Sequence, residues 1–457
     1  MEQQNNGAFA IESNSIDYVP ENKRHGSVAD LFTLWFCTNI APLAVITGAM
    51  SVVTFGLDVM SALSAIVAGH FFGALFLALA SAQGPQVGIP QMIQSRAQFG
   101  RYGSLLVVGF TTLIYLGFFI SNIILSGKTL NTVMPAINIE LATIIGAVGA
   151  TLMGIIGYHL IHSFNKVGTW LMGAALLIGF VLMLRQMNAD VLAQGAFNLS
   201  GWFAMFCICA VWQISFSPYT SDYSRYLPKE IGVFKPFIMT YLGAAVGTIF
   251  AFCFGMVAVS VAGGSDAMAA VKDSTGWFGV VLMVLFLLNI IGHNAMNLYG
   301  AVLSFITAVQ TFVGQWIPNK TVRMAASVLV LAASTAVALW ASHDFIGHFL
   351  NLIFALLFIL VSWVVINVLD FYWLNRKCYD IGAIFADDGG IYGKYNIKAL
   401  SVYALGIVVQ IPFLKNAFFT GVWADVVPNV DVSWIVGLVV TAFAFVLLNK
   451  PQPVGEK

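Results

Sequence analysis

Charged side chains are scarce in this sequence. Asp, Glu, Lys and Arg make up only 9% of the 457 residues, whereas apolar types make up 59%. A soluble domain carries about 25% charged residues, so this chain cannot build a water-facing surface, although it can build a lipid-facing one. The formal net charge is zero, which offers no basic face to a nucleic acid polymer. We therefore exclude a soluble globular enzyme and expect an all-α membrane protein.

Motifs that mark enzymes, metal sites and leaders are also lacking. The five cysteines are odd in number and show no metal-ligand spacing. No glycine-rich phosphate loop or hydrolase elbow occurs, and no paired acids lie within the apolar runs. The first residues are polar up to about Ser27, without the apolar core and cleavage site of a signal peptide. We expect no enzymatic activity, no cofactor and no cleaved leader.

Long apolar runs fill most of the chain. A helix that crosses a bilayer needs about 20 mostly apolar residues. By this criterion the sequence predicts twelve transmembrane helices, near residues 31–53, 59–81, 103–126, 138–157, 167–186, 199–220, 236–262, 277–303, 324–342, 346–370, 399–414 and 432–449.

The Lys and Arg residues are divided unevenly among the loops. With the N-terminus inside, sixteen of the 20 fall on the cytoplasmic side, which is the positive-inside bias of membrane proteins. The remaining four, on the outer side, are Lys128, Arg185, Lys272 and Lys415. We therefore predict a multi-pass protein of the cell (inner or plasma) membrane with cytoplasmic tails at 1–30 and 450–457. The hydrophilic stretch 371–398 is predicted as a cytoplasmic loop.

Two prolines interrupt predicted spans. Pro42 lies midway through the first span and Pro218 lies in the sixth. Proline removes a helix hydrogen bond, and in a membrane the freed backbone groups need protein or a water-lined cavity. The two positions correspond if residues 31–186 and 199–370 are two five-helix repeats, inverted because five is odd, with two extra helices at 399–449. Such paired breaks are typical of a transporter's central site, although ordinary kinks would give the same pattern.

Several segments, in chain order, carry a resemblance to a known family. They are GPQVGIPQMIQSRAQFGRYG (84–103), GYHLIHSFNKVGTW (157–170), SPYTSDYSRYLP (217–228), LNIIGHNAMNLY (288–299) and SWVVINVLDFYWLNRKCYD (362–380). Together they resemble the nucleobase:cation symporters of the purine–cytosine permease type. The resemblance implies the leucine-transporter fold, with ten core helices in two inverted repeats plus two more. It also implies secondary active import, by alternating access, of a nucleobase such as a purine or cytosine with a coupled cation.

The resemblance points to aromatic residues for the face of the base. In the third span the family usually places a tryptophan where Tyr115 stands here, with Phe119 one turn further, where relatives often carry a polar residue. In the sixth span, Trp212 and Phe216 are alternative stacking residues, while Gln213 and Ser215 offer polar contacts. Stacking contributes about 1–3 kcal/mol per base. Ordinary helix packing remains the alternative for Tyr115 and Phe119.

Three asparagines are candidates for the edge of the base. Asn294 and Asn297 are three residues apart in the eighth span and share one helix face. Unpaired amides at this depth usually face the interior of the bundle, where they bind ligands or bridge neighbouring helices. The family's pattern in this segment favours binding. Asn39, close to Pro42, is a third candidate.

The coupling cation is predicted from the same segment. Sodium-coupled relatives place hydroxyls in the eighth span, but the matching positions here are Gly292 and His293. Histidine titrates near neutral pH, and intramembrane ionisable groups mark proton paths. We therefore favour a proton, with His293 and Asn289 as cation-coupling residues. A sodium site built from Asn289 and carbonyls near Asn39 stays open.

Other functions remain alternatives. Within the family, the ring could be allantoin, a hydantoin or a vitamin-like heterocycle. A non-transporting nutrient sensor in the membrane is a further alternative. In each case the expected partners are a small planar solute, a coupling cation and the lipid bilayer.

Overall fold

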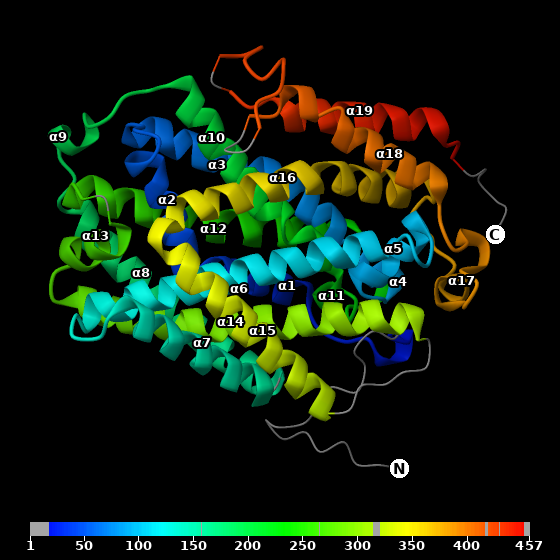
Figure 1. The fold of residues 1–457 in the computed structure, drawn as a ribbon, viewed down its shortest axis with the longest axis horizontal. Helices are drawn as coiled ribbons and strands as arrows, with labels where there is room; N and C mark the ends of the chain where they lie inside the picture. The colour runs from blue at the N-terminus through cyan, green and yellow to red at the C-terminus, as the bar shows by residue number, and fades with distance from the viewer. Residues whose placement is uncertain are drawn as a thin grey trace.

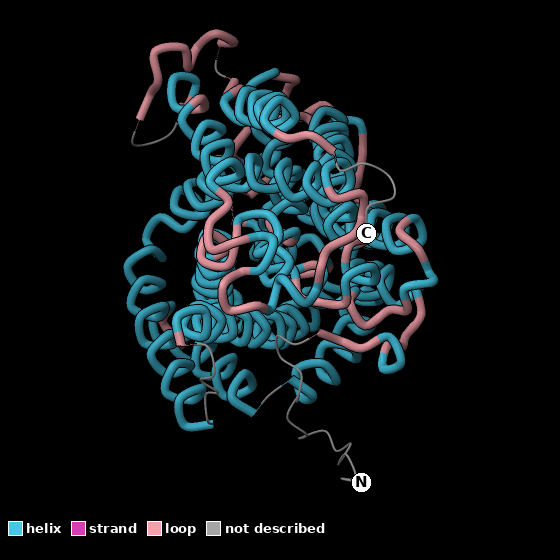
Figure 2. The backbone as a smooth tube through the Cα atoms, turned by 90° about the vertical axis from the view of Figure 1, so that its right-hand side faces the viewer, coloured by secondary structure: helices cyan, strands magenta, loops and turns pink. Residues whose placement is uncertain are grey.

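The chain forms a bundle of helices in a computed structural model that describes residues 18–156, 158–264, 266–313, 320–415, 419–428 and 430–451. Helices and loops make up the described part (Figure 2), where the single bridge between extended residues joins Lys415 and Thr420. Parts of the two predicted tails, 1–30 and 450–457, lie outside the described residues. These parts are residues 1–17 and 452–457.

Nineteen α-helices occur in this part of the chain, joined by short turns (Figure 1). The α-helices are α1 (Val28–Asn39), α2 (Pro42–Val53), α3 (Val59–Ser81), α4 (Gly84–Val87), α5 (Gln91–Phe99), α6 (Leu105–Val133), α7 (Ile139–Ile156), α8 (Tyr158–Leu184), α9 (Ala189–Leu192), α10 (Leu199–Ile214), α11 (Ser221–Ser224), α12 (Phe234–Ala262), α13 (Ala267–Ser274), α14 (Phe278–Phe312), α15 (Lys320–Ala341), α16 (Phe345–Leu369), α17 (Ile381–Phe385), α18 (Ile397–Val408) and α19 (Ser433–Leu448). The shorter turns are η1 (Glu21–Lys23), η2 (Ser217–Tyr219), η3 (Lys229–Ile231), η4 (Ser342–Asp344), η5 (Asp370–Leu374), η6 (Gly390–Tyr392) and η7 (Ile411–Phe413).

Helices occupy each of the twelve apolar runs that the sequence indicated. Among the described residues, six helices are long and apolar enough to cross a membrane, or seven if α1 and α2 form one bent span. One of the six, Thr321–Leu374, contains two predicted spans that the short turn η4 joins. Four further apolar helices are shorter, at Ile139–Leu152, Trp170–Leu184, Ile397–Phe413 and Ser433–Leu448. The total of twelve crossings stays a prediction.

The break at Pro42 is present. Helix α1 ends at Asn39, α2 begins at Pro42, and the two axes differ by 60°. Pro42 lacks an N–H donor and disfavours helical geometry in the preceding residue, and Ala41 is accordingly extended. The interruption at Pro218 is milder, because α10 ends at Ile214 but the chain continues through the 3-10 turn η2 into α11.

Two sets of helices meet in the middle of the molecule. Helices α1 and α2 pack against α12, and α3 packs against both α10 and α12. On the other side, α6, α7, α14 and α15 pack against one another. The two breaks therefore lie where the first set faces α6 and α14, and this interface positions the site described below.

The stretch 371–398 is docked on the bundle. It contains the end of η5, α17 and η6, and it packs against α5, whose nine residues are all buried. The Arg101 guanidinium lies 3.0 Å from the Asp387 carboxylate, and the Asn396 backbone N–H donates to the Phe99 carbonyl at 2.8 Å. Its hydrophilic composition reflects this polar docking as well as contact with water.

Candidate functional site

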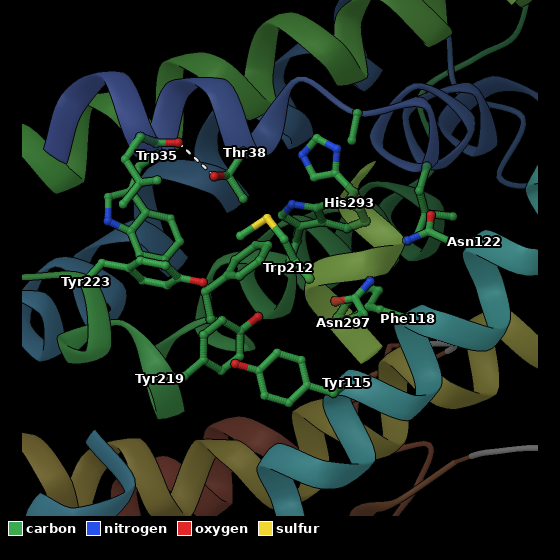
Figure 3. Close-up of a pocket in the computed structure, with 15 residues that line it drawn as sticks. Trp35, Thr38, Tyr115, Phe118, Asn122, Trp212, Tyr219, Tyr223, His293 and Asn297 are labelled. Carbon is green, nitrogen blue, oxygen red and sulfur yellow. Dashed lines mark hydrogen bonds between the residues drawn. The ribbon is translucent and has the colours of Figure 1, made fainter. Parts of the chain in front are cut away.

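A cavity of about 80 Å³ lies at the interface of the two helix sets (Figure 3). Its walls come from α1 and α2 at the first break, from α6, from α14, and from the end of α10 with the turns that follow. Aromatic side chains dominate the lining: Trp35, Tyr115, Phe118, Trp212, Phe216, Tyr219 and Tyr223. The polar lining residues are Thr38, Asn122, His293 and Asn297. A planar solute would therefore meet ring faces on several sides and only a few hydrogen-bonding groups.

Tyr115 is fixed from two directions. Its ring lies directly over Gly300 of α14, where a Cβ atom would overlap the ring. Its other neighbour is Tyr219, which stacks on it with ring centroids 4.8 Å apart at an interplanar angle of 27°. The side-by-side tyrosines are visible in Figure 3. Tyr115 thus has a defined place in the cavity wall, as the resemblance implied, and a partner that the sequence did not indicate.

Both alternatives for the sixth span line the cavity. Trp212 meets Phe118 edge to face, with centroids 5.8 Å apart, and Phe216 meets Trp35 in the same way at 5.6 Å. The Trp212 indole N–H donates to the Asn39 side-chain oxygen at 3.0 Å. Trp212 is therefore held in one orientation across the break.

Asn39 is not among the lining residues. It is fully buried, and its side-chain amide also donates to the Trp35 carbonyl at 2.7 Å. The structure thus places Asn39 behind the cavity wall, where it joins the Trp212 side chain to the backbone of α1 instead of facing the solute.

The two amides of α14 have different surroundings. Asn297 borders the cavity, whereas Asn294 is buried and donates to the Phe119 carbonyl of α6 at 3.1 Å. The Asn297 amide donates to the Asn294 side-chain oxygen at 3.3 Å. Asn294 therefore bridges two helices and orients Asn297, and of the two only Asn297 lines the cavity.

Three other candidates point elsewhere. The Gln213 side-chain nitrogen lies 2.9 Å from the Thr248 hydroxyl and 3.3 Å from Nδ1 of His70, both outside the cavity. The Ser215 hydroxyl donates to the Trp212 carbonyl at 2.8 Å, and Phe119 is fully buried. None of the three lines the cavity.

His293 borders the cavity, and Asn289 lies one turn away. Nδ1 of His293 is 3.1 Å from the Asn289 carbonyl. The Asn289 side chain is buried, and its amide oxygen has no hydrogen-bond partner within the described residues. The backbone of Thr38, near the end of α1, lies within hydrogen-bonding reach of the His293 imidazole. No group of three or more His, Cys, Asp or Glu gathers as metal ligands in the part of the chain described.

Helical spacing accounts for Phe118, Tyr219 and Tyr223, lining residues that the sequence analysis missed. Tyr115, Phe118 and Asn122 follow the spacing of one helix face, whereas Phe119 lies roughly 40° beyond Tyr115 in the other direction. Tyr219 and Tyr223 are likewise one turn apart. Working outward from Tyr115 and Phe216 at helical spacing would have found most of the aromatic lining.

Comparison with known proteins places the chain in a family. Residues 18–437 match the family described as permease for cytosine/purines, uracil, thiamine, allantoin. The putative purine-cytosine permease YxlA of Bacillus subtilis is 34% identical over 445 residues, covering 97% of this chain and 96% of that protein. The purine-cytosine permease FCY21 of Saccharomyces cerevisiae is 25% identical, covering 97% of this chain and 87% of the yeast protein.

Solved structures share the fold. Mhp1, a nucleobase-cation-symport-1 family transporter, in a closed conformation with bromovinylhydantoin bound, superposes with a TM-score of 0.75 at 16% identity, covering 96% of this chain and 94% of that one. The inward-facing conformation of Mhp1 gives 0.74 at 17% identity, with the same coverage. The all-helical fold of the leucine-transporter type is confirmed. The chain is a multi-pass membrane protein that belongs to the family of permeases for cytosine/purines, uracil, thiamine and allantoin, and it is a secondary transporter, not an enzyme.

Proposed function

We propose that this permease imports a nucleobase, such as a purine or cytosine, with a coupled cation by alternating access. The observation that carries the proposal is the cavity itself, which lies beside a helix break and combines ring faces with an amide. The relatives named as purine-cytosine permeases support the same substrate class. Mhp1, which was solved with a hydantoin bound, shows that this fold accommodates a planar heterocycle.

The base is held by its faces and by one edge. Trp212 supplies a ring face and Tyr115 supplies a neighbouring aromatic wall, since both line the cavity and both are fixed by neighbours, Asn39 for the first and Tyr219 for the second. Asn297 supplies a donor or acceptor for the edge. A site that hydrogen-bonds its substrate rejects analogues that leave its polar groups unpaired.

The coupled cation is a proton, and His293 is the group that takes it up. Its imidazole borders the cavity, so a proton at this position directly affects the bound solute and the Thr38 side of the first break. The Asn289 side-chain oxygen, which has no hydrogen-bond partner among the residues that the structure describes, gives the same region a second polar group. A sodium ion held by Asn289 and backbone carbonyls is the alternative.

The orientation follows from the loops. The permease lies in the cell membrane with twelve crossings and both termini in the cytoplasm, because this arrangement puts sixteen of the 20 Lys and Arg residues inside. The end of the molecule with α4, α5 and α17 is then cytoplasmic, and the end with α9 and α13 is external (Figure 1).

A related heterocycle is the second candidate substrate. The family description includes thiamine and allantoin, and Tyr115 replaces the tryptophan that the resemblance leads us to expect. A smaller stacking surface at this position alters which ring fits best.

Uptake into proteoliposomes tests the proposal. Labelled adenine, hypoxanthine, cytosine, uracil and allantoin are offered to the purified protein with an imposed proton or sodium gradient. The proposal expects accumulation of at least one nucleobase when the proton gradient is imposed. Accumulation of allantoin alone would show that the substrate is not a nucleobase. Binding of a base without any accumulation would favour a sensor.

Replacing His293 by glutamine is expected to uncouple transport. Glutamine keeps a polar side chain of similar length but cannot carry the proton, so accumulation driven by the proton gradient should fall at least about tenfold, while exchange of base across the membrane persists. His343→Gln, at an exposed position, is the matched control and should accumulate normally. Undiminished proton-driven accumulation in His293→Gln, or accumulation driven only by sodium in the parent protein, contradicts this assignment.

A further inference from the structure

A second recess lies away from the central cavity, at the end of the molecule that carries α13. It has a volume of about 50 Å³ and is bordered by α2, the end of α6, the start of α13 and the start of α16. In the proposed orientation this end faces outward. The recess is therefore on the side from which the solute enters.

The recess and the central cavity share two walls. On α2, Leu43 borders the central cavity, and Ile46 and Met50 border the recess. On α6, Asn122 borders the cavity and Lys128 borders the recess. At 1.5 Å per residue, the two levels are separated by roughly 9 Å along α6 and by roughly 5–10 Å along α2. The recess is thus about one to two helical turns further out along the same helices.

The lining of the recess suits a planar ring with a polar edge. Met50 and Met268 offer thioethers, which make favourable contacts with ring systems. Lys128 has no carboxylate within ion-pair distance among the described residues, and its ammonium lies 5.3 Å from the centre of the Phe345 ring. The Asp266 carboxylate, which also borders the recess, accepts the backbone N–H of Ala269. One donor cation and one acceptor anion therefore border the same small space.

This pair of charges selects a particular edge. An ammonium group prefers a carbonyl oxygen, and a carboxylate prefers a ring N–H. A lactam edge, in which a ring carbonyl adjoins a ring N–H, offers both. Hypoxanthine has such an edge, whereas adenine, with the same purine skeleton, has no carbonyl oxygen.

We propose that the recess is an outer binding site for nucleobases that carry a lactam edge, with Lys128 as the group that recognises the carbonyl oxygen. The proposal rests on the proposed transport of nucleobases and adds a site at which the solute pauses before it reaches Tyr115 and Trp212. Selection between oxo and amino bases then begins at the mouth of the permease.

Replacing Lys128 by methionine tests the recognition. The KM for hypoxanthine uptake is expected to rise roughly tenfold or more, because a hydrogen bond to a charged group is lost. The KM for adenine should stay within about twofold, and the maximal rate should be unchanged for both bases. Lys415→Met removes another cation of the predicted outer side, one that pairs with Asp425 at 2.7 Å, and should alter neither KM. Equal effects of Lys128→Met on the two bases would overturn the proposal.

Protection of an introduced thiol tests the location of the proposed outer site. Val53 borders the recess and is 36% exposed, so Val53→Cys should react with a membrane-impermeant thiol reagent, measured against protein with Val53 intact. In a Tyr115→Ala background, which weakens the central site, hypoxanthine should still slow this reaction, adenine should slow it less, and Lys128→Met should remove the protection. Lack of protection by hypoxanthine would overturn the outer site, whereas absence of uptake of every base in the parent protein would overturn the transport proposal alone.

Discussion

Replacing Tyr115 by alanine is expected to lower kcat/KM for uptake of the transported base by about 10- to 100-fold. The ring lines the cavity, is pressed against Gly300 and stacks on Tyr219, so its removal takes away part of the aromatic wall of the binding site and lets the stacked Tyr219 move out of place. Stacking on an aromatic ring contributes about 1–3 kcal/mol per base, which corresponds to this range. Initial uptake rates in proteoliposomes at several base concentrations measure the effect.

Two variants make the Tyr115 result specific. Tyr115→Phe keeps the ring and removes only the hydroxyl, so most of the uptake should remain. Gly300→Ala does not change the Tyr115 side chain itself, but it introduces a methyl group where the tyrosine ring now lies. It should therefore reduce uptake because the ring is displaced. Full activity of Tyr115→Ala, at equal amounts of folded protein, would show that this residue is only a packing element.

Replacing Gly255 by leucine is expected to prevent stable folding. Helices α2 and α12 cross so closely that a Cβ atom on Gly255 would overlap the Val45 carbonyl, and one on Gly48 would overlap the backbone of Phe252. Because the obstructing atoms belong to the backbone, a whole helix would have to move. Overpacking of this kind costs roughly 3 kcal/mol or more. The yield of monodisperse protein in detergent and its Tm report the loss.

Gly109 provides the matched control for the helix crossing. It also lies within a long helix, α6, but a Cβ atom there would meet no atom within 4 Å. Gly109→Leu should therefore leave yield and Tm unchanged or slightly raise Tm, since glycine lowers helix stability by roughly 0.5–1 kcal/mol relative to alanine. A Gly255→Leu protein as stable as Gly109→Leu would show that α2 and α12 do not cross as described.

Much of the fold could be predicted because the responsible signals are local. Apolar runs of membrane length mark the helices, and Pro42 ends one helix and begins the next through its own ring geometry. The effect of Pro218 was overestimated: in its turn the helix tightens from α to 3-10 instead of opening. The stretch 371–398 was predicted as a loop because its docking on α5 depends on partners some 280 residues earlier in the chain.

The candidate site was predictable at the level of elements but not of side chains. Composition and resemblance located α6, α10 and α14, yet the rotation of each helix decides which residues reach the cavity. Phe118 lines it whereas its neighbour Phe119 packs away from it. Gln213 was a reasonable candidate for a base edge until its partner Thr248, on α12, became visible. Such long-range partners have no signature in a single sequence.

The hydrogen bonds around Asn39 give this residue a role that the sequence alone did not indicate. The Asn39 side chain on α1 accepts a hydrogen bond from the Trp212 indole, which lines the cavity from α10, and donates one to the Trp35 backbone carbonyl of its own helix. Movement of the first broken span would therefore also move Trp212, the part of the aromatic cavity wall that belongs to the sixth span. This connection gives alternating access a physical link between the two halves at the level of the bound base.

The most direct test is the position of the bound base. Crystals grown with a brominated form of the transported base would give an anomalous bromine signal that fixes the ring in the molecule. The expected peak lies in the central cavity, between Tyr115 and Trp212 and beside Asn297. A ring found only in the outer recess, or outside both cavities, would contradict the account.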